Sequence, residues 1–219
     1  MKNKIGGIIS LIIVGAMVLF IIVSGFVDLG GAVFAKTLDE YVANPEKGMY
    51  VSGGIKMADG PIYIVTHTLN GIPTGKEYYY SVYTDEGTVV YVRASKGFQK
   101  KFVDGFSSKP VVITGKIRTM DYDVNNALSD DAKAFQDNGY EIATTGDRLL
   151  YLDDVMIPQA IMRIVFMFMV AAPIALMSVI GGNTPVQNMS GGRKAVTTIL
   201  ILVMMAGLVG LLHTVTFMF

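Results

Sequence analysis

The sequence contains no cysteine and only two histidines. Without cysteine, the chain forms no disulfide bond, has no thiolate nucleophile and supplies no sulfur ligand to zinc. Histidine is the side chain most often used for general acid–base catalysis and metal binding near neutral pH, so its scarcity argues against a histidine-centred site. We interpret His67 as an ordinary strand residue and His213 as an interfacial one. The sequence therefore predicts no cofactor and no catalytic residue.

Charged side chains are rare in three long segments, in a chain with a mean hydropathy of +0.48. Residues 5–27 have no ionisable side chain, and roughly 23 residues at about 1.5 Å each cover the ~30 Å hydrocarbon core of a bilayer. Residues 157–180 and 195–219 are also long and apolar enough to span. Arg163, inside the second segment, is expected to reach along the helix to the bilayer surface. The sequence thus predicts three transmembrane helices.

Acidic residues are absent from both ends of the chain. All 18 lie between Asp28 and Asp154, where only 13 of the 18 basic residues lie, so this middle part has a net charge near −5. Basic residues beside membrane segments favour the cytoplasmic side. We therefore expect residues 28–157 outside the cytoplasm, in a multi-pass protein of the cell membrane whose N-terminus is cytoplasmic. The flanking basic residues that indicate this orientation are Lys2, Lys4, Arg193 and Lys194.

A cleaved signal peptide is the alternative interpretation of the N-terminus. Lys2 and Lys4 precede an apolar stretch, and residues 33–35 offer a tolerable cleavage position after Ala35. The apolar stretch is, however, longer than the about 7–15 residues usual in a signal peptide. On that length we favour a retained anchor, and both interpretations place the following domain outside the cytoplasm.

Short runs rich in Tyr, Val, Ile and Thr, separated by Gly, Pro and Asn, fill the middle of the chain and predict strands. We expect helices at residues 32–42, continuing the first membrane helix, at 95–106, and at 128–135, capped by Ser129. Residues 69–75 are expected to form a loop. The predicted strands cover residues 49–57, 62–69, 77–84, 88–94, 110–118 and 148–152.

This order of strands, hairpin and helices is typical of a small Greek-key barrel of the oligonucleotide/oligosaccharide-binding (OB) type. The glycine-containing strand at residues 111–117 also resembles strands of such barrels. We therefore predict an α+β membrane protein with three transmembrane helices and an extracytoplasmic β-rich domain, an OB-like barrel; another small β-rich domain is the alternative.

In the order of its segments, the chain distantly resembles small bacterial membrane proteins that carry an exported OB-like domain, among them NfeD-type proteins. The resemblance covers the whole chain as an arrangement of segments, without a shared motif. NfeD-type proteins usually place the barrel after their membrane helices, whereas here apolar segments lie on both sides of it. The resemblance implies no site residues.

An alternation of oxygen-bearing side chains at Asp121, Asp123 and Asn125 resembles the opening of a calcium-binding loop. That motif continues with glycine at its sixth position and glutamate at its twelfth, where this chain has Asn126 and Ala132. We therefore interpret the stretch as a solvated acidic loop and keep these three residues only as weak metal candidates.

Basic residues of the middle part are weak candidates for a ligand-binding patch, with tyrosines nearby. Stacking on single-stranded nucleic acid is one interpretation of such a set, but a domain near −5 lacks the charge balance of a nucleic-acid binder. Anionic lipid headgroups or wall polymers are the expected ligands if the patch exists, and a solvated face is the alternative. The basic residues are Arg93, Lys96, Lys100, Lys101, Lys116 and Arg118.

These observations predict a membrane-anchored, non-enzymatic module whose exported domain binds an envelope component or a partner membrane protein. The expected partners are the lipid bilayer and either another protein or a second copy of this chain, but not nucleic acid. The alternatives are an accessory or pore subunit of a transporter or channel, and an exported hydrolase with a Ser/Lys pair. The predicted segments are a cytoplasmic N-terminus (1–4), transmembrane helices (5–27, 157–180, 195–219), a juxtamembrane helix and linker (28–47), the β-rich domain (48–156) and a cytoplasmic loop (181–194).

Overall fold

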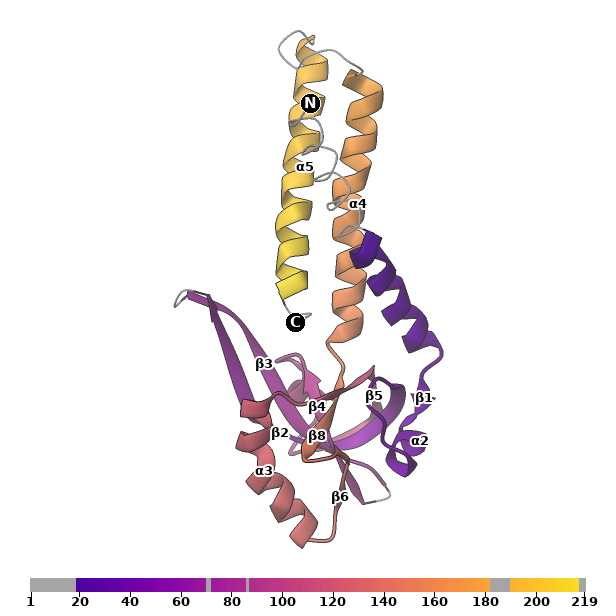
Figure 1. Cartoon of the computed structure of the whole chain (residues 1–219), viewed down its shortest axis with the longest axis vertical. Helices are drawn as coiled ribbons and strands as arrows, with labels where there is room; N and C mark the ends of the chain where they lie inside the picture. Colours follow the sequence, from indigo (N-terminus) through magenta and orange to yellow (C-terminus); the bar gives the residue numbers. More distant parts are fainter. Residues whose placement is uncertain (1–18, 70–71, 86, 182–189, 217–219) are drawn as a thin grey trace, which may run out of the picture. The chain divides into compact units, whose positions relative to one another are not determined.

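The computed structural model describes residues 19–69, 72–85, 87–181 and 190–216. The chain is an α+β protein with a large β-sheet and two apolar helices that are long enough to cross a membrane (Figure 1). It divides into two compact units, one made of residues 1–29 and 158–219 and the other of residues 30–157. Most of the first predicted transmembrane helix (5–27) and of the loop 181–194 lies outside the described residues.

The helical unit contains α4 (Met156–Gly181), α5 (Gly191–Thr216) and the N-terminal helix Leu19–Val33. Helix α5 approaches α4 closely at Gly207, where an added Cβ would lie 2.9 Å from the Cβ of Met169 and 3.0 Å from the carbonyl oxygen of Phe166. Small residues permit such close contacts between apolar helices. Helices α4 and α5 therefore pack directly against each other at this position.

The other unit is built around five strands whose pairings close into a ring. Strand β2 pairs with β3 and β5, β3 pairs with β4, and β8 pairs with both β4 and β5. The β4–β8 pair is parallel and the other four are antiparallel. The strands of the ring are β2 (Tyr50–Leu69), β3 (Ile72–Tyr83), β4 (Thr88–Ala94), β5 (Phe106–Thr119) and β8 (Arg148–Asp153).

Three short strands and one helix complete this unit. Strand β1 (Lys36–Thr37) runs parallel to β2, β6 (Glu141–Ile142) runs parallel to β4, and β7 (Thr144–Thr145) pairs antiparallel with β8. Helix α3 (Tyr122–Asp137) covers part of the sheet with Val124, Leu128 and Ala132.

Side-chain alternation along β4 separates two apolar cores. Val90, Val92 and Ala94 belong to the larger core, together with Ile113 and Ile117 of β5. The intervening residue Tyr91 points to the opposite face, where a second core forms beneath α3. Successive strand residues point to opposite faces of the sheet. A strand that is buried on both faces must therefore consist of apolar residues, or of polar residues whose side chains have partners. All seven residues of β4 are buried accordingly.

The single helix predicted at residues 32–42 is interrupted between residues 33 and 38. The N-terminal helix ends at Val33, and a new helix α2 (Leu38–Ala43) begins after Thr37. The Thr37 hydroxyl accepts from the Glu40 amide at 3.2 Å, and the Glu40 carboxylate accepts from the Thr37 amide at 2.9 Å. This reciprocal capping satisfies amide groups that a helix start otherwise leaves without partners, so it favours a fresh start here.

Two other helix predictions need correction. Between residues 95 and 106 only the short 3-10 helix η1 (Phe98–Lys101) forms, because Asp104 and Gly105 take positive φ angles of 49° and 82° and turn the chain into β5. Helix α3 begins six residues before the predicted start at 128, so Ser129 lies inside it and donates to the carbonyl of Asn126 instead of capping.

The loop predicted at residues 69–75 is too long, because Leu69 belongs to β2 and residues 72–75 belong to β3; residues 70 and 71 lie outside the described residues. Likewise, the two strands predicted at 49–57 and 62–69 are one long strand, β2. It continues through Gly60 and Pro61 with a shift of register against β3 between Asp59 and Tyr63. A bulge of this kind accommodates residues that would otherwise interrupt a strand.

Candidate functional site

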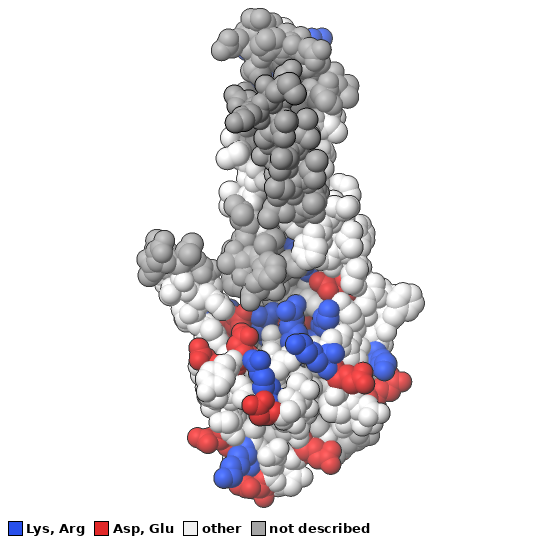
Figure 2. Space-filling view, in the orientation of Figure 1, with Lys and Arg blue, Asp and Glu red and all other residues white. Residues whose placement is uncertain are grey.

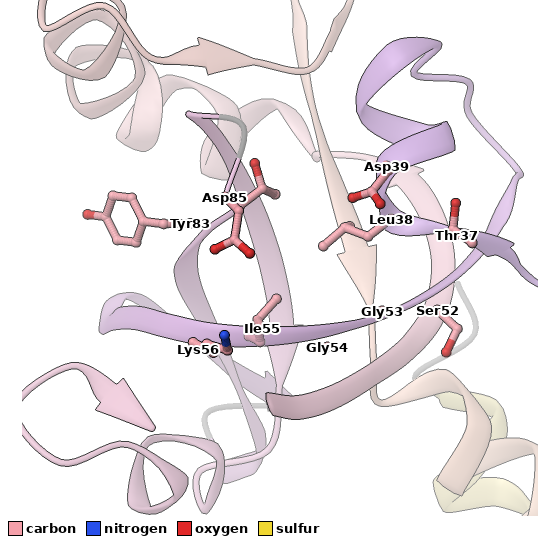
Figure 3. Close-up of a pocket in the computed structure, with 11 residues that line it drawn as sticks. Thr37, Leu38, Asp39, Ser52, Gly53, Gly54, Ile55, Lys56, Tyr83 and Asp85 are labelled. Atoms are coloured by element: carbon pink, nitrogen blue, oxygen red, sulfur yellow. The ribbon is translucent and has the colours of Figure 1, made fainter. Parts of the chain in front are cut away.

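A pocket of about 330 Å³ lies where one edge of β2 has no neighbouring strand (Figure 3). On this edge β1 pairs with β2 only at Val51 and Ser52, and β3 begins to pair at Met57. Among the described strands, none covers residues 53–56 on that side, while β5 pairs with Gly53, Gly54 and Ile55 on the other. The pocket is therefore an interruption in an otherwise continuous sheet.

The walls of the pocket come from two separate parts of the chain. Leu38 and Asp39 of α2 form one side, and Thr84 and Asp85, after β3, form the other. In Figure 3 the carboxylates of Asp39 and Asp85 lie on opposite sides of the gap, above β2. The gap thus has acidic groups on both sides.

The floor of the pocket is β2 itself. Leu38 packs directly on Gly53, where an added Cβ would lie 2.6 Å from the Leu38 Cβ, so glycine permits α2 to sit this close. Ile55 is buried in the core, whereas Gly54 and Lys56 are exposed. Main-chain amides and carbonyls along an uncovered strand edge are ready to pair with another extended chain.

Four charged residues of the ring form a network, and three of their side chains are at most 14% exposed. Arg93 of β4 binds both carboxylate oxygens of Asp153 of β8, with an Nε–Oδ1 distance of 3.0 Å, and also binds Glu77 of β3. Arg118 of β5 approaches the same Asp153 carboxylate at 3.1 Å. Burial alone would lower the pKa of Arg93, but the negative charges of Asp153 and Glu77 raise it. The network therefore connects β3, β4, β5 and β8 through two positive and two negative side chains whose charges neutralise each other.

The network includes two of the residues that were predicted to form a basic patch. Arg93 on β4 and Arg118 on β5 approach each other across the intervening strand β8, but both are engaged by Asp153. Lys116 lies with its ammonium 5.0 Å from the centre of the Tyr50 ring. Lys96 and Lys100 are exposed, the former in the turn after β4 and the latter in η1. Figure 2 shows basic side chains gathered on one face of the β-rich unit with acidic ones beside them.

Three of the tyrosines near these basic residues are packing residues. Tyr79, Tyr80 and Tyr91 are at most 1% exposed. Tyr79 contacts Tyr151 edge to face at 5.5 Å between ring centres, and the Tyr91 hydroxyl donates to Asp131 of α3 at 3.0 Å. Base stacking needs an accessible ring face, and these three rings do not provide one.

The three weak metal candidates have structural roles at the start of α3. Asp121 occupies the position before the helix and Asp123 lies in its first turn, where negative charge is favourable. The Asn125 side chain accepts from the Leu149 amide at 2.7 Å and so connects α3 to β8. Within the described residues, no group of three His, Asp or Glu side chains has the arrangement of a metal site.

The structure also describes the surroundings of His67 and of the serine hydroxyls. His67 of β2 lies 3.3 Å from the Glu77 carboxylate with a partly exposed side chain. The side chain of His213 lies outside the described residues. In the described part of the chain, serine hydroxyls bond to carbonyl groups and to Thr114 and Arg163, and none bonds to a lysine.

The helical unit contains a buried ion pair that sequence reasoning missed. Arg163 of α4 is 2% exposed, and its Nη2 lies 2.7 Å from the Asp28 carboxylate of the N-terminal helix. The expectation that Arg163 reaches along its helix to a surface is therefore replaced by a contact between helices. A sequence signal existed: each residue is the only ionisable one in its helix.

Comparisons of the chain with protein-family models, with curated proteins and with solved structures gave no match.

Proposed function

We propose that the protein is a membrane-anchored, non-enzymatic binding module whose β-rich domain captures an extended segment of a partner protein at the open edge of β2. The observation that carries the proposal is the pocket over residues 53–56, where a strand inside a closed ring of pairings lacks a neighbour on one side. Strand addition supplies affinity through main-chain hydrogen bonds and specificity through neighbouring side chains.

The ring of pairings supports an OB-like barrel as the scaffold of this module. Five strands joined in the order β2, β3, β4, β8, β5 and back to β2, with one parallel closing pair, match a small Greek-key barrel. In the OB fold, ligands usually bind across the face of the second and third strands of the barrel, which correspond to β3 and β4 in this chain. Here α3 contacts that face through Tyr79 and Tyr91, so the β2 edge is the accessible alternative.

The membrane arrangement is part of the proposal. Helices α4 and α5 are apolar over lengths that fit a bilayer. With the apolar residues 5–27, they give three transmembrane helices, with residues 28–157 outside the cytoplasm, as the distribution of basic residues favours. A peptide-binding domain at that surface meets other membrane or exported proteins.

Charge indicates the kind of segment that fits. Asp39 and Asp85 border the gap on its two sides, and one lysine, Lys56, lies on the floor. A strand that carries a basic side chain complements this arrangement, whereas an acidic strand meets like charge. A protein segment fits better than an envelope polysaccharide, because the uncovered groups are main-chain amides and carbonyls.

Site-specific photo-cross-linking tests the proposal in cells. A photoreactive residue is placed at Lys56, on the pocket floor, or as a control at Lys133, which is exposed on α3, a helix that contributes no residue to the pocket. We expect a discrete cross-linked species from Lys56 alone, whose linked residue lies in an extended basic segment, and its loss in Asp85→Lys. Equal products from both positions, or none from Lys56, would contradict the proposal.

A further inference from the structure

The helical unit contains a buried polar site at Arg163. The Arg163 guanidinium donates from Nη2 to the Asp28 carboxylate at 2.7 Å and from Nη1 to the Ser24 hydroxyl at 3.2 Å. The side chains of Arg163 and Asp28 are only 2% and 12% exposed. Ser24 lies one helical turn before Asp28, so both face the same arginine from the N-terminal helix.

The two helices touch beside this site. At Gly25 an added Cβ would lie 3.1 Å from Cγ1 of Ile164 and 3.4 Å from the carbonyl oxygen of Ala160. Glycine at this position therefore lets the N-terminal helix approach α4 closely enough for short hydrogen bonds. Next to it, the Phe26 side chain is 55% exposed.

Burial of the Asp28 charge and burial of the Arg163 charge are each tolerated only when the other charge is present. A charge buried in apolar surroundings is strongly unfavourable alone, whereas a paired one is tolerated. Arg163 is the only ionisable residue of α4, and Asp28 is the only one of the helix Leu19–Val33. The charged partners thus select each other, and no other charge on those two helices competes.

We infer that the Asp28–Arg163 pair is a fastening that keeps the N-terminal helix on α4, and that the segment before Ala35 is retained in the working protein. Cleavage after Ala35 would remove both Ser24 and Asp28, the two side chains of the N-terminal helix that accept from the Arg163 guanidinium. The inference is independent of the pocket at β2, which lies in the other unit.

Retention is tested by the mass of the mature protein. The full chain with a C-terminal tag is expressed in bacterial cells, purified from membranes in detergent, and its intact mass is measured. We expect the mass of the complete chain, with at most the initiator methionine removed. A mass that corresponds to a start after Ala35 would overturn the inference.

The fastening is tested by disulfide cross-linking, which the absence of native cysteine makes unambiguous. Gly25→Cys combined with Ile164→Cys joins the two helices at their contact, and Phe26→Cys with Ile164→Cys is the matched control. Because both cysteines lie in one chain, a protease site inserted between the helices separates uncross-linked halves. We expect oxidation in membranes to keep the halves together in the first pair only. Equal cross-linking of both pairs, or of neither, would overturn the inference.

Variants of the ion pair distinguish a fastening from a simple contact. In the cross-linking background, Asp28→Asn or Arg163→Met is expected to reduce the yield several-fold, because each leaves one buried polar group with a missing partner. The double variant Asp28→Leu/Arg163→Met removes both charges and is expected to restore most of the yield. Protease resistance of the β-rich domain checks that the variants still fold. Folded single variants with an unchanged yield would contradict the fastening.

Discussion

The Arg93 guanidinium binds both carboxylate oxygens of Asp153, although 60 residues separate the two along the chain. Arg93 is on β4 and Asp153 is on β8, where the parallel pairing closes the ring of strands. The Asp153 side chain is completely buried. The pair therefore joins the two strands whose parallel pairing completes the ring.

Removal of Arg93 is expected to destabilise the β-rich domain strongly. Arg93→Met leaves the buried Asp153 carboxylate with only Arg118, and breaking a buried pair in this way typically costs about 3–5 kcal/mol. Arg118→Met is the control, because its side chain is 36% exposed and Asp153 keeps Arg93; a smaller loss is expected. Thermal unfolding of the full chain in detergent, followed by near-UV circular dichroism, measures both. Equal losses would mean that the Arg93 pair has no special role.

A close approach of β5 to β8 predicts a second sensitive position. At Gly115 an added Cβ would clash with the main-chain carbonyl of Asp153, and main chain cannot yield as a flexible side chain does. Gly115→Ala is therefore expected to cost about 1–3 kcal/mol, as for other overpacked sites. The matched control is Gly97→Ala, where φ is −78° and the nearest atom to the added Cβ is 3.9 Å away. Unfolding midpoints that fall equally in the two variants would contradict this account.

The buried tyrosines predict loss of stability in alkali. Burial raises the pKa of Tyr151 to about 12, and it raises the pKa values of Tyr79 and Tyr91 as well. A tyrosine in the unfolded chain ionises near pH 10. Above that pH the folded state holds more protons than the unfolded state. The free energy of unfolding therefore falls as pH rises from about 10 through about 12. Below pH 10 these tyrosines are protonated in both states and do not change the free energy of unfolding.

Tyrosinate absorbance and circular dichroism, recorded together during an alkaline titration, measure this effect. We expect part of the tyrosine signal to appear only as the fold is lost. Tyr91→Phe should make the free energy of unfolding less steeply dependent on pH in this range, since one buried phenol is removed. Ionisation of every tyrosine in one step near pH 10, with the fold intact, would show that the rings are accessible.

The orientation of the membrane segments is testable because the chain has no cysteine. Ser129→Cys introduces one thiol on the exposed side of α3, and Lys194→Cys introduces one near the start of α5. With residues 28–157 outside the cytoplasm, a membrane-impermeant maleimide should label the first variant in intact spheroplasts and the second only after lysis. The reverse pattern would invert the proposed topology.

The strands were the most predictable part of the fold. The strand predicted at 88–94 is confirmed residue by residue, because its β-branched and aromatic side chains favour strands on their own. The continuation of β2 through Gly60 and Pro61 was not predictable, since these residues normally interrupt strands and only pairing on both sides of the bulge keeps the strand intact.

The candidate sites were much less predictable than the strands. The pocket exists because β1 stops pairing at Ser52 and β3 starts at Met57, which is a property of tertiary pairing. The basic residues were found as a set, but their carboxylate partners on β3 and β8 were not, because these lie far away in sequence. The ion pair in the helical unit could have been predicted from the sequence, because one apolar helix contains a single acidic residue and the other a single basic residue.

The most direct measurement of the central claim is binding of strand-forming peptides to the full chain in lipid nanodiscs. The probes are a short fluorescent peptide of alternating valine and lysine, the same peptide with methylated backbone nitrogens, and a valine–glutamate analogue. Methylation removes main-chain donors and leaves the side chains, so it isolates strand pairing.

We expect the unmodified basic peptide to bind, the methylated and acidic peptides to bind at least tenfold more weakly, and Asp85→Lys to weaken binding of the basic peptide. Asp130→Lys on α3, which makes the same charge change away from the pocket, should leave it unchanged. Equal binding of the methylated and unmodified peptides, or no binding of the basic peptide, would contradict the account.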